Sequence, residues 1–261
     1  MKRFAVIGFG AITDEMLRSL EQRGEMARLA GVLVRPQRAA EARGKAAGRF
    51  AVVDDVHSLL ALGPEIVAEC AGHGAMRQYG SAILESSTDL LCSSVGVLAD
   101  REFQSGLAKG PGRVWIPSGA VAGIDGLLAA RTAGLREVTY TSVKPPVAWN
   151  GTPGESKRGT FFEGSAREAA IHYPQNVNVG ATVALAGLGL DRTRVRLVSD
   201  AAASGPLGIV EAEGDFGRFR FEILAYASPR NPKTSLLTAH SVLMALREGM
   251  CFALFSAGRD P

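Results

Sequence analysis

Two glycines close together follow the first apolar run of the chain. Residues 6–13 read Val-Ile-Gly-Phe-Gly-Ala-Ile-Thr, so the glycines fall where a strand pattern over residues 4–8 gives way to a helical pattern. Glycine at the first position permits a tight turn, glycine at the second lets a pyrophosphate approach the backbone, and free N–H groups at the helix start attract the anion. The turn is predicted to bind a dinucleotide, the alternative being a structural turn that binds nothing. The predicted contact residues are Gly8, Gly10, Ala11 and Ile12.

Strand and helix patterns alternate from this turn to about residue 118. Apolar runs of strand length occur at residues 30–34, 50–53, 66–70, 90–95 and 114–116. Segments with helical spacing lie between them, at residues 36–47, 56–62, 73–86 and 100–108. This order predicts a parallel sheet covered on both faces, so we expect residues 1–118 to form a Rossmann-type, doubly wound α/β domain. In its first helix, the spacing of Ile12, Met16, Leu17 and Leu20 predicts one buried face.

The pattern changes after Ser118. Strand patterns now follow one another through short turns, at residues 137–144, 195–198, 209–213 and 218–225, with helical patterns at 165–172 and 179–187. An antiparallel or mixed sheet is expected from this order, and with it a second domain of α+β type over residues 119–233. Residues 234–255 are apolar with helical spacing, and this last part of the chain (234–261) can return to the first domain.

Composition argues against several classes of protein. Charged residues make up 21% of the chain, the net charge is +3 and the basic residues are scattered, so a nucleic-acid partner is not expected. No apolar stretch approaches the roughly 18 residues that a membrane-spanning helix needs. The three cysteines, Cys70, Cys92 and Cys251, lack the spacing of metal ligands and are expected to be small buried thiols in a reducing compartment. We therefore predict a cytoplasmic protein without a metal site.

The end of the second predicted strand bears on the choice of cofactor. An acidic residue there would hydrogen-bond the ribose 2′-hydroxyl of NAD. The sequence instead reads Val34-Arg-Pro-Gln-Arg38, so that Arg35 and Arg38 could clamp a 2′-phosphate with no carboxylate in the way. This arrangement favours NADP without excluding NAD. The alternative is that both arginines are solvated residues at the start of a helix.

Several longer blocks of sequence are similar to one family, the L-aspartate dehydrogenases. The blocks cover nearly the whole chain in order. They are Glu69-Cys-Ala-Gly-His73, Ser94-Val-Gly96, Ser118-Gly-Ala-Val-Ala-Gly-Ile-Asp125, Lys144-Pro145 with Trp149, Gly151-Thr-Pro-Gly-Glu155, Gly164-Ser-Ala-Arg-Glu-Ala-Ala170, Tyr173-Pro-Gln-Asn-Val-Asn178, Ala186-Gly-Leu-Gly-Leu-Asp-Arg192 and Asn231-Pro-Lys-Thr-Ser235.

The resemblance implies a fold, a reaction and a set of site residues. It implies a Rossmann-type domain followed by an α+β domain that carries the catalytic site, usually in a homodimer, and the oxidation of L-aspartate to iminosuccinate with NAD or NADP. The substrate would be a small anionic molecule. Ala120 and Asn178 fall on positions that contact the dinucleotide, Asn178 with an amide that suits a carboxamide; an alternative role for Asn178 is to cap the helix that follows. Further cofactor contacts are expected from Ala71 and Gly72.

The chain departs from the family at one position. Alignment by motif places Gly208 where the resemblance implies an active-site histidine, and residues 201–209 contain no His, Asp, Glu, Lys, Cys or Tyr. Amine oxidation needs a proton acceptor near neutral pH, so this loss should cripple aspartate oxidation while sparing cofactor binding. We assign no catalytic residue from the sequence. Reduction of a preformed imine is less demanding. Lys144 and Lys233 are the candidates for binding the substrate carboxylates, although either lysine could equally be a surface or helix-capping residue.

The other histidines do not offer an obvious replacement. His57 and His172 lie at predicted helix ends, His73 follows the fourth predicted strand, and His240 is expected to be a packed core residue of the last helix. Three functions therefore stay open. They are an aspartate dehydrogenase with altered chemistry, an NADP-dependent reductase of another small substrate, and a non-catalytic dinucleotide-binding protein.

Overall fold

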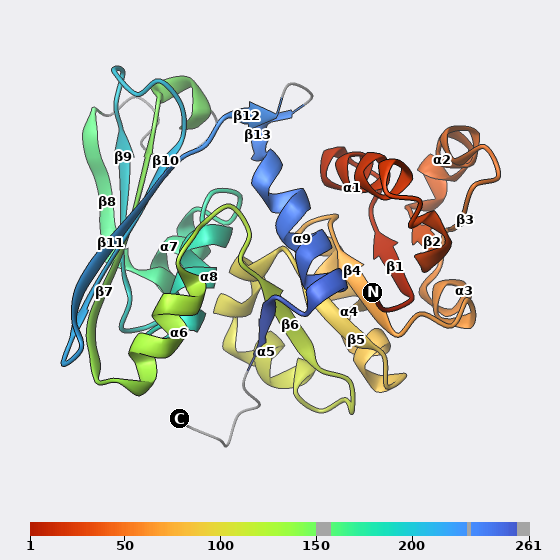
Figure 1. Cartoon of the computed structure of the whole chain (residues 1–261), viewed down its shortest axis with the longest axis horizontal. Helices are drawn as coiled ribbons and strands as arrows, with labels where there is room; N and C mark the ends of the chain where they lie inside the picture. Colours follow the sequence, from red (N-terminus) through yellow and green to blue (C-terminus); the bar gives the residue numbers. More distant parts are fainter. Residues whose placement is uncertain (150–157, 229–230, 255–261) are drawn as a thin grey trace. The chain divides into compact units, whose positions relative to one another are not determined.

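The chain folds into two compact units. The computed structural model describes residues 1–149, 158–228 and 231–254. The first unit comprises Met1–Val97, Arg101–Pro117 and the segment from Thr238 onward, and the second comprises Leu98–Asp100 and Ser118–Leu237. Each unit is built around its own sheet (Figure 1).

The first unit contains a seven-stranded sheet with the order β14-β6-β5-β4-β1-β2-β3. Its strands are β1 (Phe4–Ile7), β2 (Leu29–Leu33), β3 (Ala51–Val53), β4 (Ile66–Glu69), β5 (Asp89–Cys92), β6 (Val114–Pro117) and β14 (Cys251–Ala253). All neighbours are parallel except β14, which pairs antiparallel with β6. The accompanying helices are α1 (Ala11–Gln22), α2 (Ala39–Ala46), α3 (Val56–Ala61), α4 (His73–Glu85), α5 (Arg101–Leu107) and α9 (Leu236–Glu248). The predicted Rossmann-type architecture is confirmed.

The core of this unit follows the predicted periodicities. All four residues of β1 are buried, as expected for a central parallel strand with both faces covered. Helix α1 buries Met16, Leu17 and Leu20 on one face, as predicted, whereas Ile12 is only half-buried against the same core. The same cluster of buried side chains includes Val242 and Leu246 of α9, so the chain returns to this core after the second unit.

The last predicted helix is wrong in its extent. It was expected over residues 234–255, but α9 ends at Glu248, Gly249 adopts a left-handed conformation (φ +70°), and Cys251–Ala253 then forms β14. Glycine in this conformation commonly ends a helix. The three residues of β14 are apolar, and so short a strand cannot be distinguished in the sequence from the continuation of an apolar helix. His240 was expected in the core and is instead exposed, with Nε2 3.9 Å from Oε1 of Glu15. The buried face of α9 is formed by its neighbours Ala239 and Val242.

The second unit contains a five-stranded sheet with the order β11-β10-β7-β9-β8. The sheet is mixed, which agrees with the prediction of an antiparallel or mixed sheet. Its strands are β7 (Leu135–Lys144), β8 (Gly159–Ser165), β9 (Arg194–Ser199), β10 (Leu207–Gly214) and β11 (Gly217–Leu224). Only β7 and β9 are parallel neighbours. Helices α6 (Ile124–Thr132), α7 (Ala166–His172) and α8 (Asn178–Ala186) lie on one side of this sheet (Figure 1). A small hairpin of β12 (Ala227–Ser228) and β13 (Asn231–Ser235) follows. The sequence patterns did not reveal α6 or β8.

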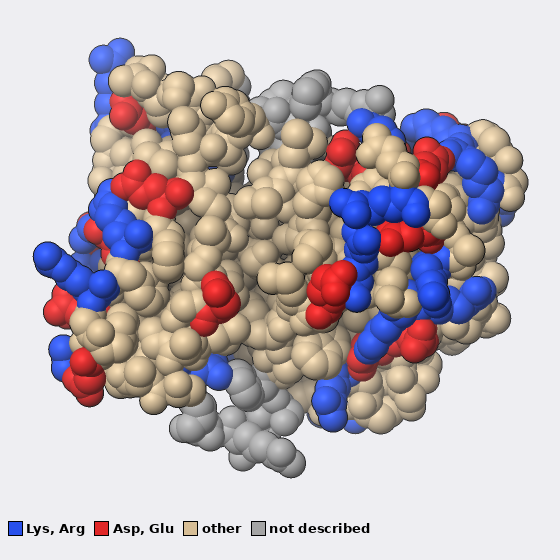
Figure 2. Space-filling model, viewed as in Figure 1, with Lys and Arg blue, Asp and Glu red and all other residues tan. Residues whose placement is uncertain are grey.

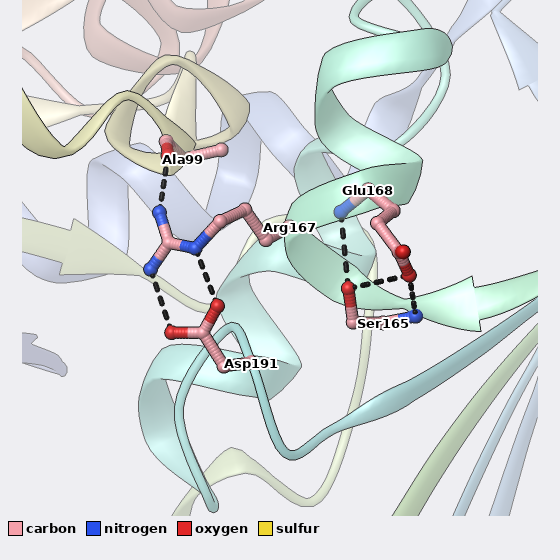
Figure 3. Close-up of polar contacts among 5 residues, drawn as sticks. All are labelled: Ala99, Ser165, Arg167, Glu168 and Asp191. Atoms are coloured by element: carbon pink, nitrogen blue, oxygen red, sulfur yellow. Dashed lines mark hydrogen bonds and ion pairs between the residues drawn. The ribbon is translucent and has the colours of Figure 1, made fainter.

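Helix α7 holds a segment that is distant in the sequence. Ser165 begins the helix with a capping box: its Oγ accepts the N–H of Glu168 at 3.2 Å, and the Glu168 carboxylate accepts the N–H of Ser165 at 2.8 Å. The Arg167 guanidinium then donates two hydrogen bonds to the Asp191 carboxylate, at 2.6 and 3.0 Å, and a third to the Ala99 carbonyl (Figure 3). Arg167 thus binds Ala99, and residues 98–100 belong to the second unit.

Candidate active site

The predicted phosphate-binding turn joins β1 to α1. Gly8 has φ +97°, and a Cβ atom placed on it would lie 2.9 Å from the Cβ of Ala71, so this position requires glycine both for its conformation and for its space. A Cβ on Gly10 would meet nothing within 4 Å. Gly10 is the N-cap of α1 and no side chain caps the helix, so the first N–H groups, those of Ala11 and Ile12, are available to an anion. The residues of this turn fit a bound diphosphate.

Thr13 ties the helix to the turn. Its side chain is completely buried, and its hydroxyl donates a hydrogen bond of 2.8 Å to the carbonyl oxygen of Gly8. The Thr13 side chain therefore links the helix to the glycine whose conformation the turn depends on.

A cavity of about 500 Å³ opens beside this turn. It is lined by residues from the β1–α1 turn, the end of β2, helix α2 and the start of α4. Four of the predicted cofactor residues, Gly8, Gly10, Arg35 and Ala71, meet around it, whereas Ala11, Ile12 and Gly72 adjoin it in sequence without lining it. It lies where Rossmann-type domains bind dinucleotides, outside the carboxyl ends of the strands.

The end of the cavity next to β2 is charged. Arg38 and Lys45 both pair with Glu41, at 2.7 and 2.8 Å, and all three side chains line the cavity together with Arg35. The expectation that no carboxylate lies near the two arginines is wrong, because one turn of α2 brings Glu41 back to the cavity. Hydrogen bonds from Lys45 and Arg38 hold the pKa of Glu41 below its usual value. Three cations face one carboxylate here, so the net charge of the group remains positive.

Charged side chains of both signs surround this region. In the space-filling view, Lys and Arg side chains alternate with Asp and Glu over the part of the first unit that carries α1 and α2 (Figure 2). Among the described residues Arg35 has no ion-pair partner, whereas Arg43 on the outer side of α2 approaches Asp54 at 3.7 Å. Arg35 is thus the arginine of the cavity whose charge is not already neutralised.

Glu69, at the end of β4, is a residue whose importance the sequence did not reveal. Its side chain is completely buried and accepts the N–H groups of Ala71 and Gly72, each at 2.7 Å. An acidic residue at the end of an otherwise apolar strand pattern was the available signal. The carboxylate shapes the loop that carries two predicted cofactor residues.

Lys144 ends β7 in the second unit. Its Nζ donates a hydrogen bond of 3.2 Å to Oδ1 of Asn176 and lies 4.5 Å from the centre of the Trp149 ring. The indole N–H of the fully buried Trp149 donates to the carbonyl oxygens of Lys144 and Val198, at 3.3 and 3.2 Å. Burial lowers the pKa of the Lys144 ammonium to about 8. Its charge has no carboxylate partner among the described residues, so Lys144 can bind an anion.

The remaining predicted residues of the second unit can be placed individually. Asn178 is the first residue of α8 and Val177 is the N-cap, so the alternative that Asn178 caps this helix is wrong. Ala120 is half-buried in the connection between β6 and α6. The side chain of Lys233 in β13, and the matched block at residues 151–155, lie outside the described residues.

Gly208 lies in β10, opposite Ser142 of β7. A Cβ atom placed on Gly208 would have the hydroxyl oxygen of Tyr140 as its nearest neighbour. Burial raises the pKa of Tyr140 to about 12, so its phenol is a hydrogen-bond donor and not a base near neutral pH. The other histidines named above lie in helices: His57 is in α3, His73 begins α4 and His172 ends α7. None of these three is in β10, the strand that contains Gly208.

A Rossmann-type unit with a glycine turn and a cationic cavity, followed by a mixed-sheet unit with a partly buried lysine, defines a two-domain nicotinamide-dependent oxidoreductase. Residues 8–110 match the model of the homoserine dehydrogenase NAD-binding domain, and residues 125–249 match that of the aspartate dehydrogenase C-terminal domain. The cofactor is therefore NAD or NADP, as predicted. No helix in the described part of the chain is long and apolar enough to cross a membrane.

Similar proteins narrow the class to one family. The L-aspartate dehydrogenase of Ruegeria pomeroyi is 40% identical over 94% of this chain and 92% of its own length, and that of Pseudomonas aeruginosa is 40% identical over 94% and 97%. The crystal structure of aspartate dehydrogenase from Thermotoga maritima superimposes with a TM-score of 0.73 at 27% identity, covering 95% of this chain and 96% of that one. The chain belongs to the L-aspartate dehydrogenase family.

Proposed function

We propose that this protein interconverts L-aspartate and iminosuccinate with NAD or NADP. The observation that carries the proposal is its 40% identity, over 94% of the chain, to proteins named as L-aspartate dehydrogenases. The nicotinamide of the bound cofactor would take a hydride from the carbon that carries the amino group, or return a hydride to the imine. The protein must bind this cofactor, bind a dicarboxylate and provide for the transfer of one proton.

The cofactor is assigned to the cavity of the first unit. The open backbone at Gly10 and the N–H groups of Ala11 and Ile12 would bind the diphosphate. Arg35 would bind a 2′-phosphate, which favours NADP over NAD, since Glu41 is already paired with Arg38 and Lys45. Ala71 and Gly72 of the first unit keep their proposed roles as cofactor contacts, and so do Ala120 and Asn178 of the second unit.

Lys144 is assigned to a substrate carboxylate, and Lys233 keeps the same proposed role. The ammonium of Lys144 is fixed by Asn176 and by the Trp149 ring, so that binding an anion requires little reordering of its side chain. Because Gly208 carries no side chain and Tyr140 stays protonated, neither residue can serve as a base near neutral pH. We therefore propose that imine reduction is the more effective direction of catalysis.

Steady-state kinetics of the purified protein tests this proposal. L-Aspartate oxidation and the reduction of iminosuccinate, generated in the assay, are measured with both cofactors, and Lys144→Met serves as the comparison. We expect the protein to reduce the imine with NADPH, and we expect this rate to fall strongly in Lys144→Met. Aspartate oxidation should be slower, by a factor of about 10² or more, than catalysis assisted by a histidine would be. Binding of NADPH without turnover of either substrate would overturn the proposal in favour of a non-catalytic dinucleotide-binding protein.

The assembly and location of the protein are also proposals. The family resemblance supports a homodimer in the cytoplasm. Light scattering of the purified protein at micromolar concentration tests the first point, and a monomer would contradict it.

A further inference from the structure

Glu69 connects the loops that follow two adjacent strands. Its Oε1 accepts the N–H groups of Ala71 and Gly72 in the loop after β4, and its Oε2 accepts the N–H of Ser94 after β5, at 3.1 Å. Strands β4 and β5 are parallel neighbours, with Glu69 opposite Cys92. One carboxyl group therefore fixes the backbone of both loops at the carboxyl edge of the sheet.

This carboxyl group is unusual in having no counter-ion. It is completely buried, and among the described residues it forms no ion pair. Its titratable neighbours are the thiols of Cys70 and Cys92, whose pKa values burial raises, with the charge of Glu69 adding to the effect. Burial also raises the pKa of Glu69, but the N–H groups that surround it oppose this shift, and they are the partners that an ionised carboxylate needs. Three N–H donors on one carboxyl group favour its ionised form.

The position of Glu69 relates it to one half of the cofactor. Strand β4 adjoins β1 on the side opposite β2, whose end carries Arg35. A dinucleotide that crosses the Gly8–Gly10 turn, with its adenosine half near Arg35, places its nicotinamide half over the ends of β4 and β5. Ala71, which Glu69 holds, lines this cavity.

We propose that Glu69 is a positioning residue for the nicotinamide half of the cofactor, and that its negative charge favours the oxidised, positively charged ring over the reduced, neutral ring. The hydrogen bonds fix the loops on which the ring lies. The charge acts through a buried region, where electrostatic interactions are stronger than in water. This inference rests on cofactor binding alone and holds whichever substrate is used.

Equilibrium titration of the full-length protein with NADP⁺ and NADPH tests the inference, using Glu69→Gln. The amide keeps the size of the side chain and an oxygen that can accept from Ala71 and Gly72, but it removes the charge and the acceptor for the N–H of Ser94. We expect the Kd for NADP⁺ to rise roughly tenfold while the Kd for NADPH changes less than about threefold. Glu65→Gln is the matched control, because Glu65 is exposed and precedes β4 at the opposite end of the strand; its ratio of the two Kd values should equal that of the wild type.

A loss of packing alone would weaken the oxidised and reduced cofactors by the same factor, so an unchanged ratio of Kd values in Glu69→Gln overturns the proposal. Glu69→Asp covers the case in which the amide variant does not fold. It keeps the charge on a shorter side chain, and we expect both forms to bind more weakly with the wild-type ratio preserved to within about threefold. A tenfold change of that ratio in a folded Asp variant would equally overturn the proposal. Failure of aspartate turnover affects neither result.

Discussion

The hydroxyl oxygen of Tyr140 lies 3.3 Å from the position that a Cβ atom on Gly208 would occupy. The two residues belong to the adjacent antiparallel strands β7 and β10. A contact this short requires the phenol to move by a few tenths of an ångström before any side chain fits at position 208. The absence of a side chain at Gly208 and the presence of the Tyr140 hydroxyl are thus two parts of one local arrangement.

Restoring a histidine should therefore require two changes. Gly208→His alone is expected to add little aspartate oxidation, because Tyr140 crowds the new side chain at a cost of about 1 kcal/mol or more in stability. The double variant with Tyr140→Phe removes the hydroxyl and should gain about 10²-fold in kcat/KM for aspartate. Tyr140→Phe by itself is the control and should gain nothing. If Gly208→His matches the double variant in activity and in Tm, Tyr140 is not the obstacle.

The two glycines of the phosphate-binding turn should respond differently to alanine. Gly8→Ala introduces a side chain at φ +97° and 2.9 Å from Ala71, so we expect a loss of about 2 kcal/mol in the free energy of unfolding. Gly10→Ala meets open space in the protein and should unfold within about 0.5 kcal/mol of the wild type. Its methyl group would instead meet the diphosphate, so its Kd for NADPH should rise at least tenfold, on the order of 1.4 kcal/mol. Thermal unfolding and NADPH titration separate these effects, and wild-type affinity in Gly10→Ala would place the cofactor elsewhere.

Arg35 should decide the preference for NADP. Arg35→Ala removes a cation that has no ion-pair partner among the described residues and lines the cavity. We expect the Kd for NADPH to rise about tenfold with that for NADH nearly unchanged, because only NADPH carries the 2′-phosphate. Arg43→Ala is the matched control, since Arg43 lies on α2 outside the cavity lining and pairs with Asp54. Equal weakening of NADPH and NADH in Arg35→Ala would remove the reason for preferring NADP.

Features that depend on neighbours along the chain could be predicted from the sequence. The buried face of α1 is set by the spacing of Met16, Leu17 and Leu20, and the turn by the glycines that end β1. The alternation of such elements was enough to identify the Rossmann-type sheet. Each of these properties is decided within about ten residues.

Features that depend on tertiary packing could not be predicted in this way. Glu41 returns to the arginine cluster only because α2 turns once after Arg38, and Asn176 meets Lys144 across the second unit. The three-residue strand β14 exists because β6 offers it an edge, although its residues continue an apolar helical pattern. The charge state of Lys144, likewise, follows from its burial beside Trp149, which no motif encodes.

Lys144 should make substrate binding depend on pH. Burial lowers the pKa of its ammonium to about 8, so its positive charge is mostly present at pH 7 and mostly lost at pH 9. A dicarboxylate that does not itself titrate in this range, such as succinate, should therefore inhibit about tenfold more weakly at pH 9 than at pH 7. Lys144→Arg keeps its charge throughout and should give a flat profile, whereas Lys144→Met should bind weakly at both values. Because the proposed NADPH site at Arg35 does not include Lys144, cofactor affinity serves as the internal control. A succinate inhibition constant that is the same at pH 7 and pH 9 in the wild type would remove Lys144 from the substrate site.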